Sequence, residues 1–109
     1  MEMRHLRYFV AVAEELNFTR AALRLHMAQP PLSTQIRALE EEIGAELLVR
    51  DTRRVFLTQA GKEFLLRARA ILAAAQQATE AARSASAGIF GRIALGVTAS
   101  AMFTERLPR

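Results

Sequence analysis

Cysteine is absent from the 109-residue sequence, which excludes disulfide bridges and zinc sites built from thiolates. No uninterrupted apolar run approaches the roughly 20 residues that a membrane-spanning helix requires. The first residues are charged and lead into Glu14 and Glu15, which is unlike a secretory signal peptide. Together these absences predict a cytoplasmic protein.

Lysine is nearly absent as well, because Lys62 is the single lysine among 15 basic residues. The net charge is +4, which is moderate for this length. Arginine's rigid fork matches phosphate groups and guanine edges better than an ammonium group does. Charge alone therefore permits a nucleic-acid partner without identifying one. The positions of the arginines are needed to show whether the chain binds nucleic acid.

The sequence also has little of what catalysis needs. His5 and His26 are its only histidines, and each lies in a different predicted helix without a carboxylate at metal-ligand spacing. Ser33 has no general base nearby that would make it a nucleophile. We therefore expect no enzyme activity, no metal and no cofactor.

Apolar spacing predicts three short helices. The first runs from Met3 to Leu16, where apolar residues recur at helical intervals. Asn17 is placed to cap a second helix from Phe18 to about His26. The third begins at Pro30, since proline suits a first turn, and ends before Gly44. Its predicted buried face consists of Leu32, Ile36, Leu39 and Ile43.

Two short apolar runs follow, at residues 46–50 and 55–57, and predict a small β-hairpin with its turn at residues 51–54. Thr58 is placed to cap a long alanine-rich helix at residues 59–87, which the glycines of residues 88–91 should break. Residues 92–97 then alternate like a strand that has no sheet to join. The chain is therefore expected to stop inside a second domain.

The predicted fold is mainly α: a winged helix-turn-helix over residues 1–58, with three helices and a hairpin wing, followed by a long linker or dimerisation helix at residues 59–90. The helix-turn-helix itself spans residues 18–37. The long helix carries a seam with alternating spacings of 4 and 3, which favours a partner helix over an isolated linker. The seam residues are Phe64, Ala68, Ile71, Ala75, Ala78, Ala82 and Ala85.

Polar residues at the start of the third helix are the predicted contacts to base edges, because such a helix presents its N-terminal outer face to the major groove. A basic hairpin tip and the start of the second helix are predicted to hold phosphates, with solvated turns and faces as the alternative. The predicted DNA-binding residues are Thr19, Arg20, Gln29, Pro30, Pro31, Ser33, Thr34, Arg37, Arg53 and Arg54.

The ordered motifs resemble the LysR-type transcriptional regulators over the whole chain. Residues 3–14 are similar to that family's first helix, residues 18–44 to its helix-turn-helix, and residues 47–50 and 57–61 to its wing and the entry to its linker helix. Two positions depart from the pattern: Thr34 stands where many members carry a basic residue, and Leu48 where they typically carry Phe. Residues 29–33 and the first helix are most similar to the branch that controls the breakdown of aromatic compounds.

The resemblance implies a dimer that binds an imperfect dyad in double-stranded DNA near a promoter, with dimers that often pair into tetramers. It also implies that residues 91–109 begin an effector-binding domain, in which Thr98 and Ser100 would help to bind a small-molecule inducer in a full-length protein. The main rival is a helical dimer that uses its helix-turn-helix to hold a protein. Binding to DNA should weaken steeply with salt, whereas the rival predicts little effect of salt.

Overall fold

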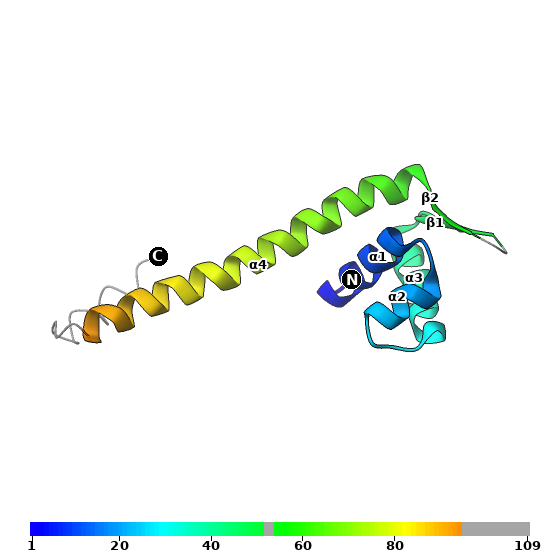
Figure 1. Ribbon diagram of the computed structural model, residues 1–109. Helices are drawn as coiled ribbons and strands as arrows, with labels where there is room; N and C mark the ends of the chain where they lie inside the picture. The colour runs from blue at the N-terminus through cyan, green and yellow to red at the C-terminus, as the bar shows by residue number, and fades with distance from the viewer. Residues whose placement is uncertain (52–53, 95–109) are drawn as a thin grey trace. The chain divides into compact units, whose positions relative to one another are not determined.

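The computed structural model of the protein describes residues 1–51 and 54–94. Its elements follow the order α1 (Met3–Glu15), α2 (Phe18–Arg24), α3 (Gln29–Ile43), β1 (Leu48–Arg50), β2 (Val55–Leu57) and α4 (Gln59–Ala94) (Figure 1). Residues Met1–Ala73 form one compact unit, called the head below, and the second unit begins at Ala74. Within the described ranges, no helix has the length and apolarity needed to cross a membrane.

The head is built on α1, whose apolar stripe is buried as its spacing predicts. Leu6, Phe9, Val10 and Ala13 are all at most 8% exposed. The helix ends at Glu15, one residue earlier than predicted, because Leu16 adopts the left-handed conformation (φ 51°). Its first turn is closed by His5, whose Nδ1 accepts a hydrogen bond from the Glu2 N–H at 2.9 Å. The ring's Nε2 lies 3.0 Å from Gln35 Oε1 and so links α1 to α3.

Asn17 caps α2 as predicted, because its side-chain oxygen accepts a hydrogen bond from the Arg20 N–H at 2.8 Å. The helix ends at Arg24 rather than near His26. The turn into α3 requires the left-handed conformation at His26 (φ 58°), and this backbone cannot continue a right-handed helix.

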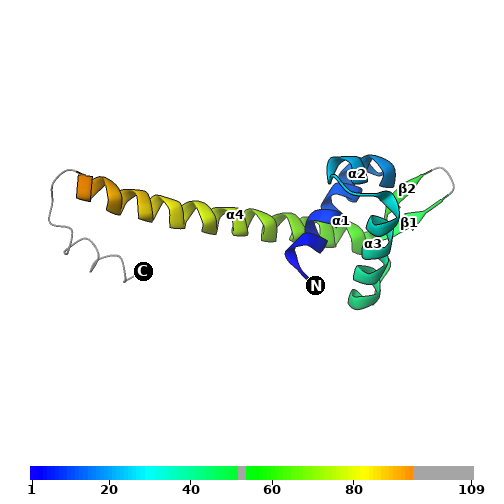
Figure 2. The same cartoon turned by 90° about the horizontal axis from the view of Figure 1, so that it is seen from below.

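Helix α3 begins at Gln29 and carries both prolines in its first turn, as their chemistry favours. Leu32, Ile36 and Leu39 are buried, but Ile43 is 39% exposed, so its predicted burial is wrong. Ile43 is the last residue of the helix, and the chain turns away directly afterwards at Gly44 (φ 83°). Figures 1 and 2 show α1, α2 and α3 side by side, with the hairpin projecting from them.

The hairpin is antiparallel and pairs Leu48 with Leu57, Val49 with Phe56, and Arg50 with Val55. Its first strand starts two residues later than predicted. The N–H groups of Leu47 and Leu48 bind one oxygen of the Glu40 side chain, at 2.8 and 3.1 Å, and this contact fixes the chain where it enters the hairpin. The predicted hairpin is confirmed, with its boundary corrected.

The start of α4 lies against Leu47, the residue that precedes β1. Thr58 caps the helix as predicted, since its Oγ1 accepts a hydrogen bond from the Gly61 N–H at 2.9 Å. The Thr58 hydroxyl also donates to the carbonyl oxygen of Glu46 at 2.6 Å. Gly61 is buried, and a Cβ at this position would collide with the backbone carbonyl of Leu47. The helix therefore approaches the backbone of Leu47 so closely that only glycine fits.

The first turns of α4 pack on the head, which the seam prediction did not foresee. The rings of Phe9 and Phe64 meet edge to face at 5.2 Å between centroids. Ala68 is fully buried with Leu6 and Val10. Phe64 and Ala68 of the predicted seam thus pack against the head's own core. The first turns of α4 find this contact because α1 carries apolar residues on two faces.

The predicted break at residues 88–91 is wrong, since α4 continues to Ala94. A glycine in a helix costs about 1 kcal/mol relative to alanine, too little to end a helix among good helix formers. Residues 92–94 are accordingly helical rather than extended, and the rest of the predicted strand lies outside the described residues.

An ion-pair network joins three helices of the head. Glu14 of α1 accepts a hydrogen bond from Arg24 of α2 at 2.7 Å and from Arg69 of α4 at 2.8 Å. The hydrogen bond from Arg69, and after it the one from Arg24, hold the pKa of the Glu14 carboxyl below its ordinary value. All three side chains are 31–53% exposed, so the network orients the helices more than it stabilises them.

We predict that Gly61→Ala destabilises the head by about 1–3 kcal/mol or more, because the added methyl group meets a backbone carbonyl that cannot rotate away. Urea unfolding followed by circular dichroism measures this change. Gly88→Ala is the matched control, since no atom lies within 4 Å of a Cβ there. A Gly61→Ala protein as stable as the Gly88→Ala protein would contradict the close approach.

Candidate nucleic-acid interface

The outer face of α3 carries the residues that the sequence assigned to base reading. Pro30, Pro31, Thr34 and Arg37 are exposed, and Gln29 and Ser33 are partly exposed. The buried residues of α3 hold the opposite side of the helix in the core of the head. The N-terminal half of α3 therefore presents amide, hydroxyl and guanidinium groups outward. This is the placement that a recognition helix requires.

Thr34 differs from its neighbours in how its hydroxyl is used. Its Oγ1 donates a hydrogen bond to the Pro30 carbonyl oxygen at 3.0 Å. The donor is thus engaged within the helix, and the methyl group and the acceptor lone pairs of the hydroxyl remain for an external partner. Thr34 is accordingly a weaker candidate for a polar contact than Gln29 or Ser33.

Thr19 and Arg20 are both exposed in the first turn of α2. Arg24, further along the helix, pairs with Glu14 and Glu15, which explains it as part of the head's structure. The second helix therefore offers two groups near its start for an external anion, while the arginine of its last turn is engaged in the network described above.

A groove of about 200 Å³ lies between the start of α2 and the turn end of the hairpin. Thr19 lines one part of it and Arg54 another, although 35 residues separate them in the sequence. The groove also contains Asp51, whose backbone N–H donates to the Arg54 carbonyl oxygen at 2.9 Å. The structure thus joins two predicted phosphate-binding residues that the sequence placed on separate elements. Arg53 lies outside the described residues.

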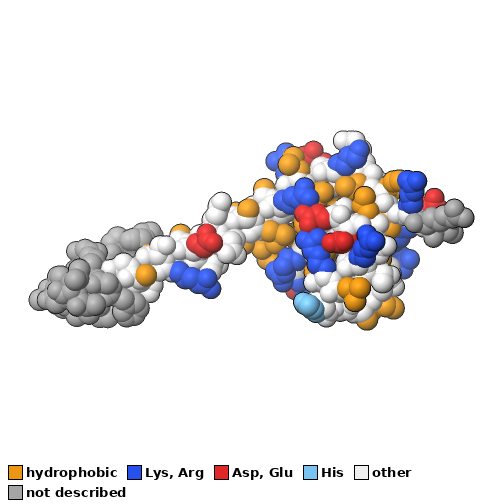
Figure 3. All heavy atoms as spheres, in the orientation of Figure 1, with side chains coloured by type: hydrophobic (Ala, Val, Ile, Leu, Met, Phe, Trp, Pro, Cys, Tyr) orange, Lys and Arg blue, Asp and Glu red, His pale blue; other side chains and the backbone are white. Residues whose placement is uncertain are grey.

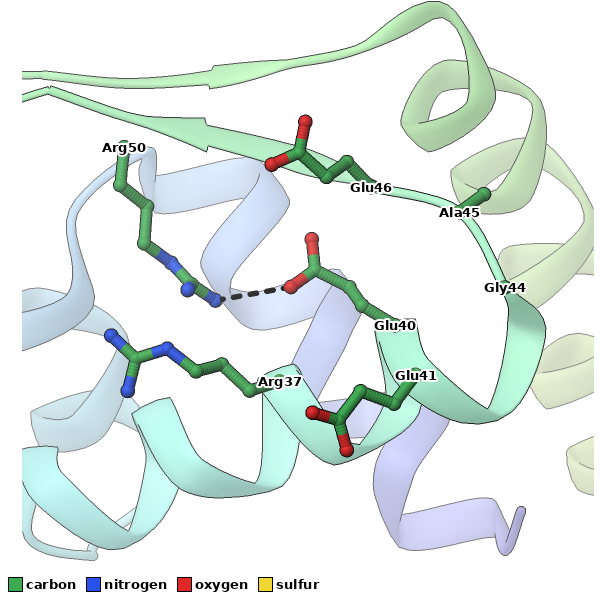
Figure 4. Close-up of a pocket in the computed structure, with 7 residues that line it drawn as sticks. All are labelled: Arg37, Glu40, Glu41, Gly44, Ala45, Glu46 and Arg50. Carbon is green, nitrogen blue, oxygen red and sulfur yellow. Dashed lines mark hydrogen bonds and ion pairs between the residues drawn. The ribbon is translucent and has the colours of Figure 1, made fainter.

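A second pocket, of about 460 Å³, lies between the C-terminal half of α3 and β1 (Figure 4). Its lining carries charges of both signs, and consists of Arg37, Glu40, Glu41, Gly44, Ala45, Glu46 and Arg50. Three carboxylates around two guanidinium groups make this pocket a poor seat for a phosphate. Its charged groups instead tie the hairpin to α3.

Arg50 lines this pocket, and no prediction from the sequence singled it out. Its guanidinium carbon lies 4.9 Å from the centroid of the Phe18 ring, and its Nη2 lies 3.4 Å from Glu40 Oε1. Burial lowers the pKa of Arg50; Glu40 opposes this shift and Arg37 adds to it. Arg50 thereby connects β1 to both α2 and α3. The only sequence signal for it was the family-like run at residues 47–50.

The space-filling view shows basic side chains distributed over the visible face of the head, around a few acidic groups (Figure 3). The exposed arginines of the head include Arg20 and Arg24 of α2, Arg37 of α3 and Arg54 of the hairpin. On α4, the predicted seam residues from Ile71 onward are exposed, namely Ile71, Ala75, Ala78, Ala82 and Ala85. Thr98 and Ser100 lie outside the described residues.

Comparison with known proteins finds a matching family model and homologous proteins. Residues 3–62 match the family model described as "Bacterial regulatory helix-turn-helix protein, lysR family". The chain is 55% identical over 103 residues to YnfL, an uncharacterized HTH-type transcriptional regulator of Escherichia coli. It is 50% identical over 107 residues to the HTH-type transcriptional regulator BudR of Klebsiella aerogenes. These matches cover 94% and 98% of this chain, and 35% and 75% of the two relatives.

Two solved structures are similar in fold as well as sequence. The DNA-binding domain of BenM in complex with catB site 1 DNA has a TM-score of 0.77 at 49% identity, covering 79% of this chain and 96% of that one. The CbnR DNA-binding domain in its DNA complex has a TM-score of 0.76 at 48% identity, covering 79% and 99%. The predicted winged helix-turn-helix fold is thereby confirmed.

The chain spans about a third of the length of YnfL, so the similarity concerns the helix-turn-helix end of that relative. The match to the family model covers more than half of the chain, and it includes all of α1, α2, α3 and the hairpin. The protein belongs to the LysR family of bacterial regulatory helix-turn-helix proteins.

Proposed function

We propose that this chain is the DNA-binding part of a LysR-type transcriptional regulator, which inserts α3 into the major groove of double-stranded DNA and lays its hairpin wing beside it. The observation that carries the proposal is the outward polar face at the start of α3, held by a buried apolar back. The relatives BenM and CbnR, whose DNA-binding domains have been solved in DNA complexes, support it. Chromosomal DNA as the partner places this activity in the cytoplasm.

In this proposal, base reading depends on the N-terminal half of α3. Gln29 and Ser33 form hydrogen bonds with base edges, and Pro30 and Pro31 contact thymine methyl groups by shape. Arg37 lies about two turns further along from Gln29 and is long enough to reach a base or the backbone. Thr34 contributes mainly through its methyl group, because its hydroxyl donates to Pro30.

Phosphate contacts come from the two elements on either side of the groove described above. Thr19 and Arg20 hold one strand from α2, and Arg54 holds it from the wing, together with Arg53. Such contacts fix the register of the protein on the duplex and carry no sequence information themselves.

We also propose a homodimer formed along α4, on an imperfect dyad near a promoter, with tetramers as a further assembly. The support is one exposed face of α4 on which Ile71, Ala75, Ala78 and Ala82 recur at spacings of 4, 3 and 4. Small side chains allow a second helix to approach closely. Effector binding through Thr98 and Ser100 is proposed on the sequence resemblance alone.

The proposal assigns the chain no catalytic step. In the described part of the chain, no group of three or more His, Cys, Asp or Glu residues is arranged to hold a metal ion. A helix-turn-helix that binds a protein instead of DNA remains the alternative function, and the salt dependence of binding separates the two.

Gln29→Ala and Ser33→Ala are each expected to cost about 1–3 kcal/mol on the selected site and little on DNA of random sequence. Fluorescence anisotropy between 50 and 300 mM salt measures both, using a site selected from fragments of the source genome. Gln77→Ala on α4 is the control for loss of an exposed glutamine. Equal losses on both DNAs would mean that these residues only position the protein, and an affinity independent of salt would rule out DNA as the ligand.

Ala75→Glu is expected to weaken the dimer by at least tenfold, because it places two like charges across the proposed seam. Ala73→Glu is the matched control, since two helical positions turn the side chain by about 200° to the opposite face of α4. Sedimentation equilibrium measures both dissociation constants. A dimer that both variants weaken equally would show that this face is not the seam.

A further inference from the structure

The outer face of the hairpin carries two exposed apolar side chains. Val49 and Phe56 are register partners and are 45% and 42% exposed, while their strand neighbours Leu48 and Leu57 face the core of the head. An exposed phenylalanine on a two-stranded hairpin adds nothing to that core. Its ring is therefore available for another interaction.

That interaction is with Arg54. The guanidinium carbon of Arg54 lies 5.5 Å from the centroid of the Phe56 ring, within the range of a cation–π contact. The two residues have one position between them on the second arm of the hairpin, so their side chains lie on the same side of the strand. The Arg54 backbone is fixed too, because its carbonyl oxygen accepts a hydrogen bond from the Asp51 N–H.

Arg54 also lines the groove at the start of α2, together with Thr19 and Asp51. A guanidinium released from the ring would sample many rotamers, and a phosphate would then have to order the side chain on binding. A guanidinium held on the ring keeps its N–H edge available for an external anion, since the cation–π contact uses only its flat face.

We propose that Phe56 is a positioning residue for Arg54: its ring holds the guanidinium at the turn end of the wing, so that the wing presents a preorganised cation to the DNA phosphate faced by Thr19. The inference rests on the proposed function. Its physical gain is entropic, because a long arginine side chain ordered before binding loses less freedom when the phosphate arrives.

The test compares Phe56→Leu, which keeps an apolar side chain of similar size but removes the ring, with Phe56→Tyr, which keeps the ring. Affinity is measured on random-sequence duplex DNA, where phosphate contacts dominate. Phe56→Leu is expected to weaken binding by about two- to fivefold, and Phe56→Tyr to restore it. Val49→Ala, which shortens the equally exposed partner without touching Arg54, is the control and should have no effect.

A double-mutant cycle links the effect to Arg54. In an Arg54→Ala background, Phe56→Leu should have no further effect on affinity. Arg54→Ala itself should reduce the slope of log affinity against log salt by about one. In the free protein, the Nε–Hε signal of Arg54 in the NMR spectrum should shift in Phe56→Leu and stay in place in Val49→Ala, because the ring current is lost only in the former.

The outcomes distinguish a failure of Arg54 as a phosphate contact from a failure of Phe56 as its positioning residue. An Arg54→Ala protein with unchanged affinity and salt slope would overturn Arg54 as a phosphate contact, and with it this inference. A normal loss in Arg54→Ala combined with an unaffected Phe56→Leu, or with the same Phe56→Leu loss in both backgrounds, would overturn only the positioning role. An Arg54 signal that does not move in Phe56→Leu would overturn it without any DNA in the measurement.

Discussion

The carboxylate of Glu40 is the contact on which the arrangement of the head depends. One of its oxygens accepts hydrogen bonds from two successive backbone N–H groups, those of Leu47 and Leu48, and the other lies 3.4 Å from Arg50. A two-stranded hairpin is marginal by itself. Glu40 fixes the entry of this hairpin to α3, and Arg50 extends the connection to Phe18 of α2. The wing and the proposed recognition helix are thereby held as one body.

This connection determines which proposed DNA contacts act together. Thr19 and Arg54 come from distant parts of the sequence but line a single groove, because the hairpin is held close to the start of α2. The close approach at Gly61 has the same consequence for the first turns of α4, which pack against the backbone of Leu47 and against α1. The hairpin and these first turns are thus held in the same unit as the outer face of α3.

Local chemistry explains what the sequence predicted well. Asn17, the two prolines, Gly44 and Thr58 mark helix ends through their own hydrogen bonds or backbone preferences, and the structure bears out each of these caps. Long-range packing, such as that of α4 on α1, could not be predicted from the sequence in this way. Phe64 and Ala68 have the spacing of a dimer seam, but the spacing cannot tell a partner chain from α1 of the same chain. The predicted break at residues 88–91 is wrong for another reason, because isolated glycines are tolerated within a long helix.

The most direct test of the Glu40 connection is amide hydrogen exchange, measured by NMR in the wild-type protein and in Glu40→Ala. The account predicts that the amides of Leu47 and Leu48 exchange much faster in Glu40→Ala. The exchange rates of the α1 amides around Val12 should change only as much as the change in global stability requires. Exchange at Leu47 and Leu48 that changes no more than exchange at Val12 would contradict it, because the hairpin would then be held to α3 without the carboxylate.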